Sequence, residues 1–344
     1  MRKEKRNKKV AVAMSGGVDS SVAAALLKRA GFDVVGAHMK LNDFSSEGEK
    51  RARKVAKILK IPFYAMRFEK EFKKRVVDCF LKEYKAGPTP NPCVVCNKEI
   101  KFGLLLEKAL SLGADFIATG HYARMADRRL LKGKDKEKDQ SYFLWQLSQN
   151  QLSRILFPVG NYTKEEVRKL AKKFGLPVFD APESQEICFI SGSIEDFLKK
   201  YLKEKPGSVL DKQGKILGRH RGLWFYTIGQ RKGIGLSGGP YFVLDKNIKQ
   251  NVLIVTKNEK DLLKKELVVK NVNWISGKPL KLPMKIKTKI RYRHKAVSAR
   301  IYNIQNTRYK MLFDKSQRAI TPGQSAVFYS GQELLGGGII CYNK

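Results

Sequence analysis

The residues near the start of the chain best suited to chemistry are SGGVDS at 15–20. An apolar run at 9–14 precedes them, and an alanine-rich, helix-forming segment follows. Two glycines between a buried strand and a helix let backbone N–H groups turn toward an anion, and the helix N-terminus adds positive charge. The stretch lacks the lysine and the spacing of the common GxxxxGK[ST] loop. We nevertheless predict an ATP site, with hydroxyls from Ser15 and Ser20 and a magnesium ion on Asp19.

Three cysteines form the second group of reactive residues. Cys93 and Cys96 have CxxC spacing after the proline-rich stretch 88–92, and Cys188 follows almost a hundred residues later. We expect a helix to begin at Asn97, so that its N-terminus and nearby lysines lower the pKa of the CxxC thiols. Cys79 and Cys341 are interpreted as structural.

A CxxC pair can be half of a zinc site, a redox dithiol or part of a cluster ligand set. A structural zinc site normally has four ligands, and the sequence contains no second CxxC and no HxxxH pattern. Thiols close to an ATP site indicate a narrower chemistry, sulfur transfer, in which ATP activates an oxygen that a sulfur nucleophile then displaces.

Alternating patterns predict the elements that must position these residues. Strands are expected at 9–14, 33–39, 62–68 and 115–119, and helices at 18–30, 47–60, 69–85, 97–112 and 163–174, the last with Thr163 as its N-cap and Glu166 at the third position. Such alternation favours a parallel sheet with helices on both faces and ligands at the carboxyl ends of its strands. The SGGVDS loop, Met39 and Gly120 all fall at such ends.

The pattern changes after about residue 195. Short β-like runs separated by glycine-rich turns extend from 207 to 256, the stretch 235–240 being interpreted as a hairpin turn, and 265–344 alternates like a β-barrel. We therefore predict three domains, at 1–195, 196–264 and 265–344. One expected strand, 284–294, would align a row of six cations on one face as a phosphate track: Lys285, Lys287, Lys289, Arg291, Arg293 and Lys295.

Composition limits the class of protein. The 344 residues include 69 Lys and Arg against 32 Asp and Glu, a net charge of +37. Such an excess favours a polyanionic partner, with nucleic acid the first choice and a generally lysine-rich surface the alternative. Hydrophobic residues make up 42%, enough for globular cores, and five cysteines are too few for a disulfide scaffold. We expect a cytoplasmic protein.

These motifs resemble those of known families. SGGVDSS is similar to the signature of the ATP pyrophosphatases (PP-loop, adenine nucleotide α-hydrolase-like proteins), which split ATP between its α and β phosphates. The chain as a whole resembles the bacterial-type tRNA-uridine 2-sulfurtransferases, which thiolate the wobble uridine. The resemblance runs through AMSGGVDSS, HMK, TPNPxxxCNKEIKFG, ATGHYAR, KDQSYFL, SQEICFI, YTIGQRKG and KIRYR.

The resemblance implies a role for particular residues. ATP would be held by Ala13, Met14, Ser15, Gly16, Gly17, Val18, Asp19, Ser20, Met39 and Gly120. Contacts with tRNA would come from Asn91, Pro92, Cys93, Lys138, Asp139, Gln140, Arg291 and Tyr292. Uridine C2 oxygen would be adenylated, and Cys188 would carry a persulfide supplied by a sulfur-donor protein. Cys96 would then release the sulfur and form a disulfide with Cys188. A monomer would suffice for this reaction.

Cys93 departs from the family pattern, which usually has aspartate there. Three thiolates, from Cys93, Cys96 and Cys188, would also suit a [4Fe–4S] cluster with one open iron. We favour the persulfide route because Cys96 and Cys188 occupy the family's paired positions. Two rival functions remain: an ATP pyrophosphatase that acts on a small molecule, and an RNA-binding protein with a non-catalytic nucleotide fold.

Overall fold

The computed structural model describes residues 7–42, 46–181, 187–305 and 308–342. Five parallel strands form the N-terminal sheet in the order β3-β2-β1-β4-β7. Their bounds are β1 Lys9–Ala13, β2 Asp33–Lys40, β3 Phe63–Arg67, β4 Phe116–Ala118 and β7 Ile155–Leu156. The predicted parallel sheet is confirmed.

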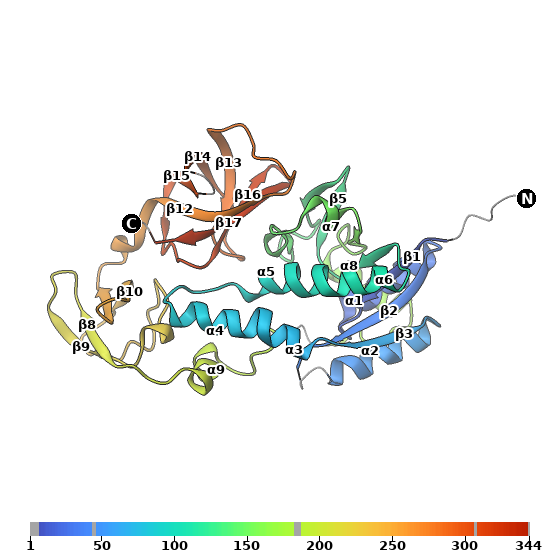
Figure 1. The fold of residues 1–344 in the computed structure, drawn as a ribbon, viewed down its shortest axis with the longest axis horizontal. Coiled ribbons are helices and arrows are strands. Elements are labelled where there is room, and N and C mark those ends of the chain that lie inside the picture. Colours follow the sequence, from blue (N-terminus) through green and yellow to red (C-terminus); the bar gives the residue numbers. More distant parts are fainter. Residues whose placement is uncertain (1–6, 43–45, 182–186, 306–307, 343–344) are drawn as a thin grey trace, which may run out of the picture.

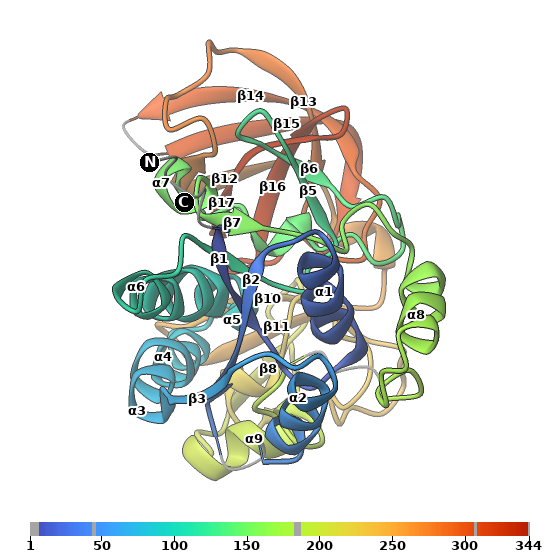
Figure 2. The same cartoon turned by 90° about the vertical axis from the view of Figure 1, so that its right-hand side faces the viewer.

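Helices cover both faces of this sheet (Figures 1 and 2). Val10 and Val12 of β1 pack in one core cluster with α1 (Val18–Arg29), whereas Ala11 packs with Ala109 of α6 (Leu105–Ser111) on the other side. Because successive side chains of a strand point to opposite faces and both faces are covered, β1 is apolar from Val10 to Ala13. Helices α2 (Ser46–Ile58) and α8 (Lys164–Lys173) complete the α1 side.

The two helical segments that follow β3 lie side by side in Figure 1. The first comprises α3 (Glu69–Phe72), a π-helical stretch (Lys73–Val77) and α4 (Asp78–Lys85). The second comprises α5 (Pro92–Cys96), a π-helical stretch (Asn97–Leu104) and α6. Our expectation that this helix begins at Asn97 is wrong: it begins at Pro92, because proline fits the first helical position, where no N–H partner is needed. Both CxxC thiols therefore lie within the helix.

The central domain contains α9 (Ile194–Tyr201) and four strands in the order β10-β11-β8-β9. These strands are β8 Gly207–Leu210, β9 Ile216–His220, β10 Phe242–Asn247 and β11 Val252–Thr256. Buried residues of this four-stranded sheet share a core cluster with Phe80 of α4 and with Phe189. The central domain therefore packs against the helical segment that contains α4.

Six antiparallel strands close into the C-terminal barrel, where β12 pairs with both β15 and β17. They are β12 Leu263–Trp274, β13 Met284–Lys289, β14 Val297–Gln305, β15 Arg308–Arg318, β16 Ser325–Ser330 and β17 Glu333–Cys341. A hairpin of the N-terminal region, β5 (Ala123–Ala126) and β6 (Arg129–Lys132), joins this sheet at β17. The sequence patterns did not predict this hairpin.

The expected row of six cations on one strand is wrong. Strand β13 ends at Lys289, and residues 290–295 turn toward β14. Lys285 and Lys287 are exposed, but the Lys289 ammonium is largely buried and lies 3.4 Å from Asp139. The continuous phosphate track is therefore absent from the described strands, and the remaining cations reach the surface from a loop.

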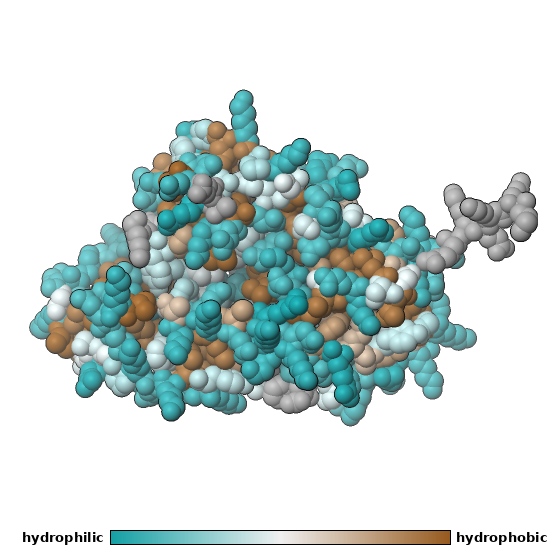
Figure 3. All heavy atoms as spheres, in the orientation of Figure 1, coloured by the Kyte–Doolittle hydropathy of each residue, from teal (hydrophilic) through white to brown (hydrophobic). Residues whose placement is uncertain are grey.

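Hydrophilic residues dominate the face of the molecule shown in Figure 3. Among the residues that the structure describes, no helix has both the length and the apolar character needed to cross a bilayer.

Candidate functional site

The SGGVDS loop leaves β1 and enters α1 in a tightly constrained conformation. Gly16 has φ +83°, and a Cβ there would collide with the carbonyl oxygen of Gly48 in α2. The hydroxyl of Ser20 accepts a hydrogen bond from Ser15 N at 3.2 Å and donates to Gly17 O at 3.1 Å. These bonds fix the loop at the α1 N-terminus, where helical N–H groups face an anion.

Gly120 packs directly against this loop. A Cβ at residue 120 would lie 2.6 Å from Ser20 N and 2.7 Å from the carbonyl carbon of Asp19, so only glycine permits the approach. Met39 lies near the carboxyl end of the neighbouring strand, β2, and is half-buried. The strand-end positions predicted for ATP therefore adjoin one another at residues 19, 20 and 120.

Asp19 has partners that the sequence patterns did not predict. Lys164 Nζ lies 2.7 Å from Asp19 Oδ1 and 2.8 Å from Oδ2, and the Tyr122 hydroxyl donates to Oδ1 at 2.7 Å. Lys164 opens α8, whose capping box at Thr163 and Glu166 was predicted. The start of α8 therefore supplies the cation that the SGGVDS loop lacks. In the sequence, the position of Lys164 next to the predicted N-cap Thr163 was the feature that could have indicated this role.

The thiol of Cys96 is buried, and burial raises its pKa to about 12. Our expectation of a lowered thiol pKa is wrong at this position, because desolvation outweighs the nearby cation and the helix N-terminus. The ammonium of Lys101 opposes the shift, whereas the negative charges of Cys188 and Cys93 add to it. Cys96 therefore lies within electrostatic reach of both other cysteines.

Cys188 is exposed, yet its crowded surroundings also raise its pKa, and Lys101 again opposes the shift. Ile187 and Phe189, the residues on either side of it, pack in the same core cluster as Cys96. All five cysteines are free thiols here, and the described residues contain no group of three or more His, Cys, Asp or Glu side chains that could hold a metal ion. The iron–sulfur alternative gains no support from this arrangement.

Lys101 also connects the thiols with the nucleotide loop. Its charge, together with burial as the larger cause, lowers the pKa of His121 well below the ordinary value. His121 follows Gly120, and its Nδ1 lies 2.8 Å from the Thr119 hydroxyl. His121 is therefore buried and neutral, and Lys101 contributes to the resolved pKa shifts of His121, Cys96 and Cys188 in the described chain.

The residues predicted to contact tRNA divide into two groups. Asn91 immediately precedes α5 and hydrogen-bonds the buried Tyr142, while Tyr292 stacks near Phe143 with ring centroids 4.4 Å apart. Pro92 and Cys93 occupy the first turn of α5. These side chains surround the approach to the thiols.

Segment 138–140 is tied into the protein. The carboxylate of Asp139 is 4% exposed, accepts N–H bonds from Gly133 and Ser141, and faces Lys289. Asp139 therefore positions the segment, and its side chain is not available to tRNA. Gln140 bonds the backbone of Tyr122 through its side chain and its own N–H.

Arg291 is half-buried in the barrel loop. Its guanidinium donates to Ala319 O and to the Thr321 hydroxyl, and burial lowers its pKa. Nearby positive charge from Arg318 lowers it further. Arg318 is itself ion-paired with Glu259, its Nε lying 2.6 Å from Oε1, whereas Arg291 is held by neutral oxygens and retains a charge that favours a nearby anion.

Comparison with known proteins agrees with this architecture. Residues 8–192 match the family model described as the tRNA methyl transferase HUP domain, 195–257 its PRC-barrel domain, and 264–340 the aminomethyltransferase beta-barrel domain. The tRNA-specific 2-thiouridylase MnmA of Clostridium perfringens is 46% identical, covering 97% of this chain and 98% of its own. The protein of that name from Syntrophomonas wolfei is 48% identical, covering 96% and 99%.

A solved 4-thiouridine synthetase in complex with RNA and ATP is 19% identical, with a TM-score of 0.36 over 53% of this chain and 44% of its own. A similarity that weak supports no conclusion, whereas the curated relatives match almost from end to end. The chain belongs to the tRNA-specific 2-thiouridylase family.

Proposed function

We propose that this protein catalyses ATP-dependent 2-thiolation of the wobble uridine of tRNA. The observation that carries the proposal is the packing of Cys96 in one core cluster with Ile187 and Phe189, the neighbours of Cys188. Phe102, on the same helical segment as Cys96, has its ring centroid 5.8 Å from that of His121, which follows Gly120 at the nucleotide loop. Two thiols near an ATP-type loop match the needs of a reaction that activates an oxygen and then replaces it with sulfur.

In the first step, ATP binds with its phosphates at the α1 N-terminus. The uridine C2 oxygen attacks the α phosphate, which forms an adenylated uridine and expels pyrophosphate. Lys164 moves from Asp19 onto the phosphates and replaces the lysine that the loop itself lacks. Asp19 would then hold a magnesium ion, which neutralises phosphate charge; one carboxylate with phosphate oxygens is a common magnesium ligand set.

In the second step, a persulfide on Cys188 attacks C2 through its terminal sulfur, and AMP leaves with the oxygen. Cys96 then attacks the Sγ of Cys188, the bond between the two sulfurs of the former persulfide breaks, and the thiocarbonyl forms. The products are 2-thiouridine and a Cys96–Cys188 disulfide, so the transferred sulfur gains the two electrons that the thiols lose. A thiol reductant restores both cysteines.

The partners follow from this chemistry. A sulfur-donor protein delivers the persulfide to Cys188, whose exposure gives it access, while burial shields Cys96. The anticodon loop places the flipped uridine against Asn91, Pro92 and Cys93, and a loop base is already unpaired, so flipping costs little. Lys138, Gln140, Arg291 and Tyr292 contact the RNA around it. We infer that the enzyme is a monomer and that it acts on tRNA in the cytoplasm.

The test is mass spectrometry of nucleosides from tRNA incubated with the protein, ATP, a sulfane-sulfur donor that loads the Cys188 persulfide, and a thiol reductant. We expect 2-thiouridine only with ATP, with a uridine at the wobble position, and with one AMP formed per thiolated base. A transcript with cytidine at that position is the matched control. Pyrophosphate release independent of tRNA would instead favour a small-molecule pyrophosphatase, and tRNA binding without ATP consumption would favour the non-catalytic alternative.

The iron–sulfur route is distinguished from the persulfide route by purifying the protein without oxygen and measuring its iron content and its absorbance. Colourless, iron-free protein that thiolates tRNA supports the persulfide route, whereas activity that depends on bound iron overturns it.

A further inference from the structure

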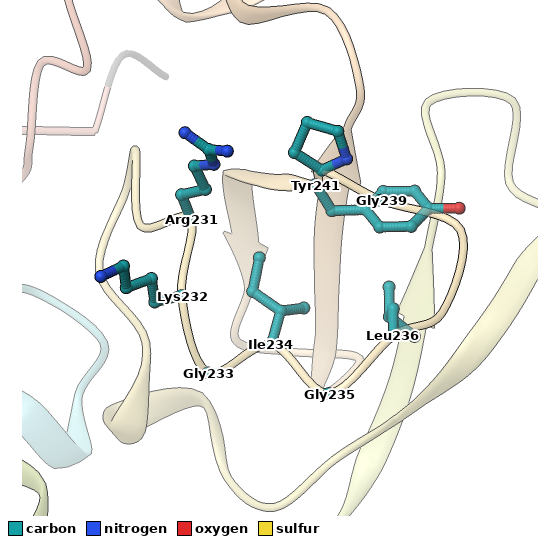
Figure 4. Close-up of a pocket in the computed structure, with 9 residues that line it drawn as sticks. Arg231, Lys232, Gly233, Ile234, Gly235, Leu236, Gly239 and Tyr241 are labelled. Carbon is teal, nitrogen blue, oxygen red and sulfur yellow. The ribbon is translucent and has the colours of Figure 1, made fainter.

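The central domain contains a cavity of about 390 Å3 that the reaction above does not use. Figure 4 shows its nine lining residues, with Arg231 and Lys232 on one side of the loop and Tyr241 on the other. Its volume lies in the ~300–1,000 Å3 range of small-ligand sites. Gly235, Leu236, Gly239 and Pro240 of the stretch expected to form a hairpin turn line this cavity, which is partly open to solvent.

The chemistry of the lining matches a nucleotide. Arg231 and Lys232 are exposed, and no ion pair or acidic lining residue neutralises them within the described chain. Over the described residues, no hydrogen bond is made by a backbone N–H of 231–239, and Gly233, Gly235 and Gly238 have positive φ. Free N–H groups on a glycine-rich loop, with two cations, form an anion-binding concavity.

The apolar part of the pocket faces this polar part. Ile234 is buried, Leu236 is half-buried, and both rise from the loop toward Tyr241 in Figure 4. Lys257 Nζ lies 5.2 Å from the centroid of the Tyr241 ring, which adds a third cation on this aromatic side. An aromatic ring beside aliphatic side chains is the surface on which an unpaired base stacks.

The segment that contains the pocket contacts the loop that leads to the proposed catalytic cysteines. Thr227, at the start of the same segment, lies 3.3 Å from the hydroxyl of Thr89, in the proline-rich approach to Cys93. A Cβ at Gly229 would lie 2.5 Å from the side chain of Ala319 and 3.5 Å from the guanidinium of Arg318, so the segment that leads to the pocket also packs against the barrel.

We propose that this pocket binds one unpaired nucleotide of the tRNA, outside the wobble position. Its phosphate lies on the loop N–H groups and the Arg231 and Lys232 side chains, and its base lies against Tyr241. The inference rests on the proposed function for the identity of the RNA, and it adds a second recognition point that would help to select the substrate.

The experiment compares the affinity for tRNA of three variants at several salt concentrations. In Arg231→Ala/Lys232→Ala we expect a Kd at least tenfold weaker and a log–log salt slope smaller by up to about 2. The control is Lys215→Ala/Lys249→Ala, which removes the same charge from exposed sites of the same domain and should change both quantities much less. Tyr241→Ala should weaken binding about 5- to 150-fold, and Tyr241→Phe should restore it, because stacking needs only the ring.

Unchanged thermal melting of all of these variants shows that the domain is folded. Equal affinities of the two double variants for tRNA would show that the pocket does not bind the RNA. Loss with Arg231→Ala/Lys232→Ala but not with Tyr241→Ala overturns the nucleotide assignment, since only a phosphate would then bind. If the wild type thiolates tRNA, these failures leave the proposed function intact; if the wild type neither binds nor thiolates tRNA, both fail.

Discussion

Lys164 and Asp19 form an ion pair between elements 145 residues apart, with Nζ 2.7 and 2.8 Å from the two carboxylate oxygens. Asp19 lies in the first turn of α1, and Lys164 opens α8, so the pair joins two helix N-termini beside the nucleotide loop. Side-chain exposures of 14% and 30% leave the pair partly shielded from solvent. The Lys164 ammonium is therefore already close to the proposed phosphate site, and a short side-chain movement would bring it into contact with a bound triphosphate.

Lys164→Ala is therefore expected to slow tRNA-dependent ATP cleavage about 10- to 150-fold, the loss of one charge-assisted contact. Lys164→Arg keeps the charge but not the shape and should recover part of the rate. Rates are followed by AMP formation. Lys169→Ala, on the same helix and paired with Glu165 at an exposed site, is the control and should match the wild type. Equal rates for Lys164→Ala and the control would remove Lys164 from the phosphate site.

Gly120→Ala tests the close packing at the loop. The new methyl group would meet Ser20 N and the Asp19 backbone at less than van der Waals distance, so the start of α1 must shift. We expect at least a tenfold weaker affinity for ATP, measured by equilibrium binding. Gly113→Ala, with φ +80° but open space around it, should cost only about 1 kcal/mol of stability and leave ATP affinity unchanged. Normal ATP binding by Gly120→Ala would contradict the assigned site.

The raised pKa of Cys96, about 12, predicts a strong pH dependence. Below that value the thiol is protonated, so the thiolate fraction, and with it the alkylation rate of Cys96, should rise about tenfold per pH unit between pH 7 and 9. Lys101→Met removes the cation that lowers this pKa and should slow alkylation at every pH. Peptide-resolved mass spectrometry after brief iodoacetamide treatment measures the rate. A rate that is flat across this range would mean that Cys96 is already ionised.

Arg291→Ala should combine two effects, because the guanidinium donates hydrogen bonds inside the barrel and is proposed to contact the RNA. Loss of its hydrogen bonds to Ala319 and Thr321 should reduce the free energy of unfolding by about 1–3 kcal/mol. Weaker tRNA binding with a smaller salt slope should accompany it. Lys285→Ala, an exposed barrel variant, is the control for charge. Reduced stability without any change in tRNA affinity would make Arg291 purely structural.

Most of the N-terminal fold could be predicted from sequence. Apolar strands followed by glycine turns and helices with caps determine a parallel sheet locally, and the capping box at Thr163 and Glu166 forms as expected. The helix start was misplaced because the three prolines before Cys93 resemble a stiff loop, although Pro92 fits the first helical turn.

Other features depend on tertiary contacts and have no local signal. Strand β13 ends at Lys289, whose ammonium lies 3.4 Å from Asp139, a residue of another domain, and nothing in the alternating basic pattern indicates this contact. The pKa of Cys96 follows from burial by packing around Phe189, and the ion pair of Lys164 follows from the meeting of two helices. The family resemblance placed Cys96 and Cys188 together, but only the fold connects them with Lys101.

The most direct test of the central claim is a single-turnover reaction with persulfide-loaded protein, ATP and tRNA, quenched by rapid alkylation. We predict one 2-thiouridine and one Cys96–Cys188 disulfide-linked peptide per turnover, and neither with Cys188→Ser or Cys96→Ser. Formation of 2-thiouridine by both single variants, or in the wild type with all thiols still reduced, would contradict the claim that these two cysteines act together beside the adenylate.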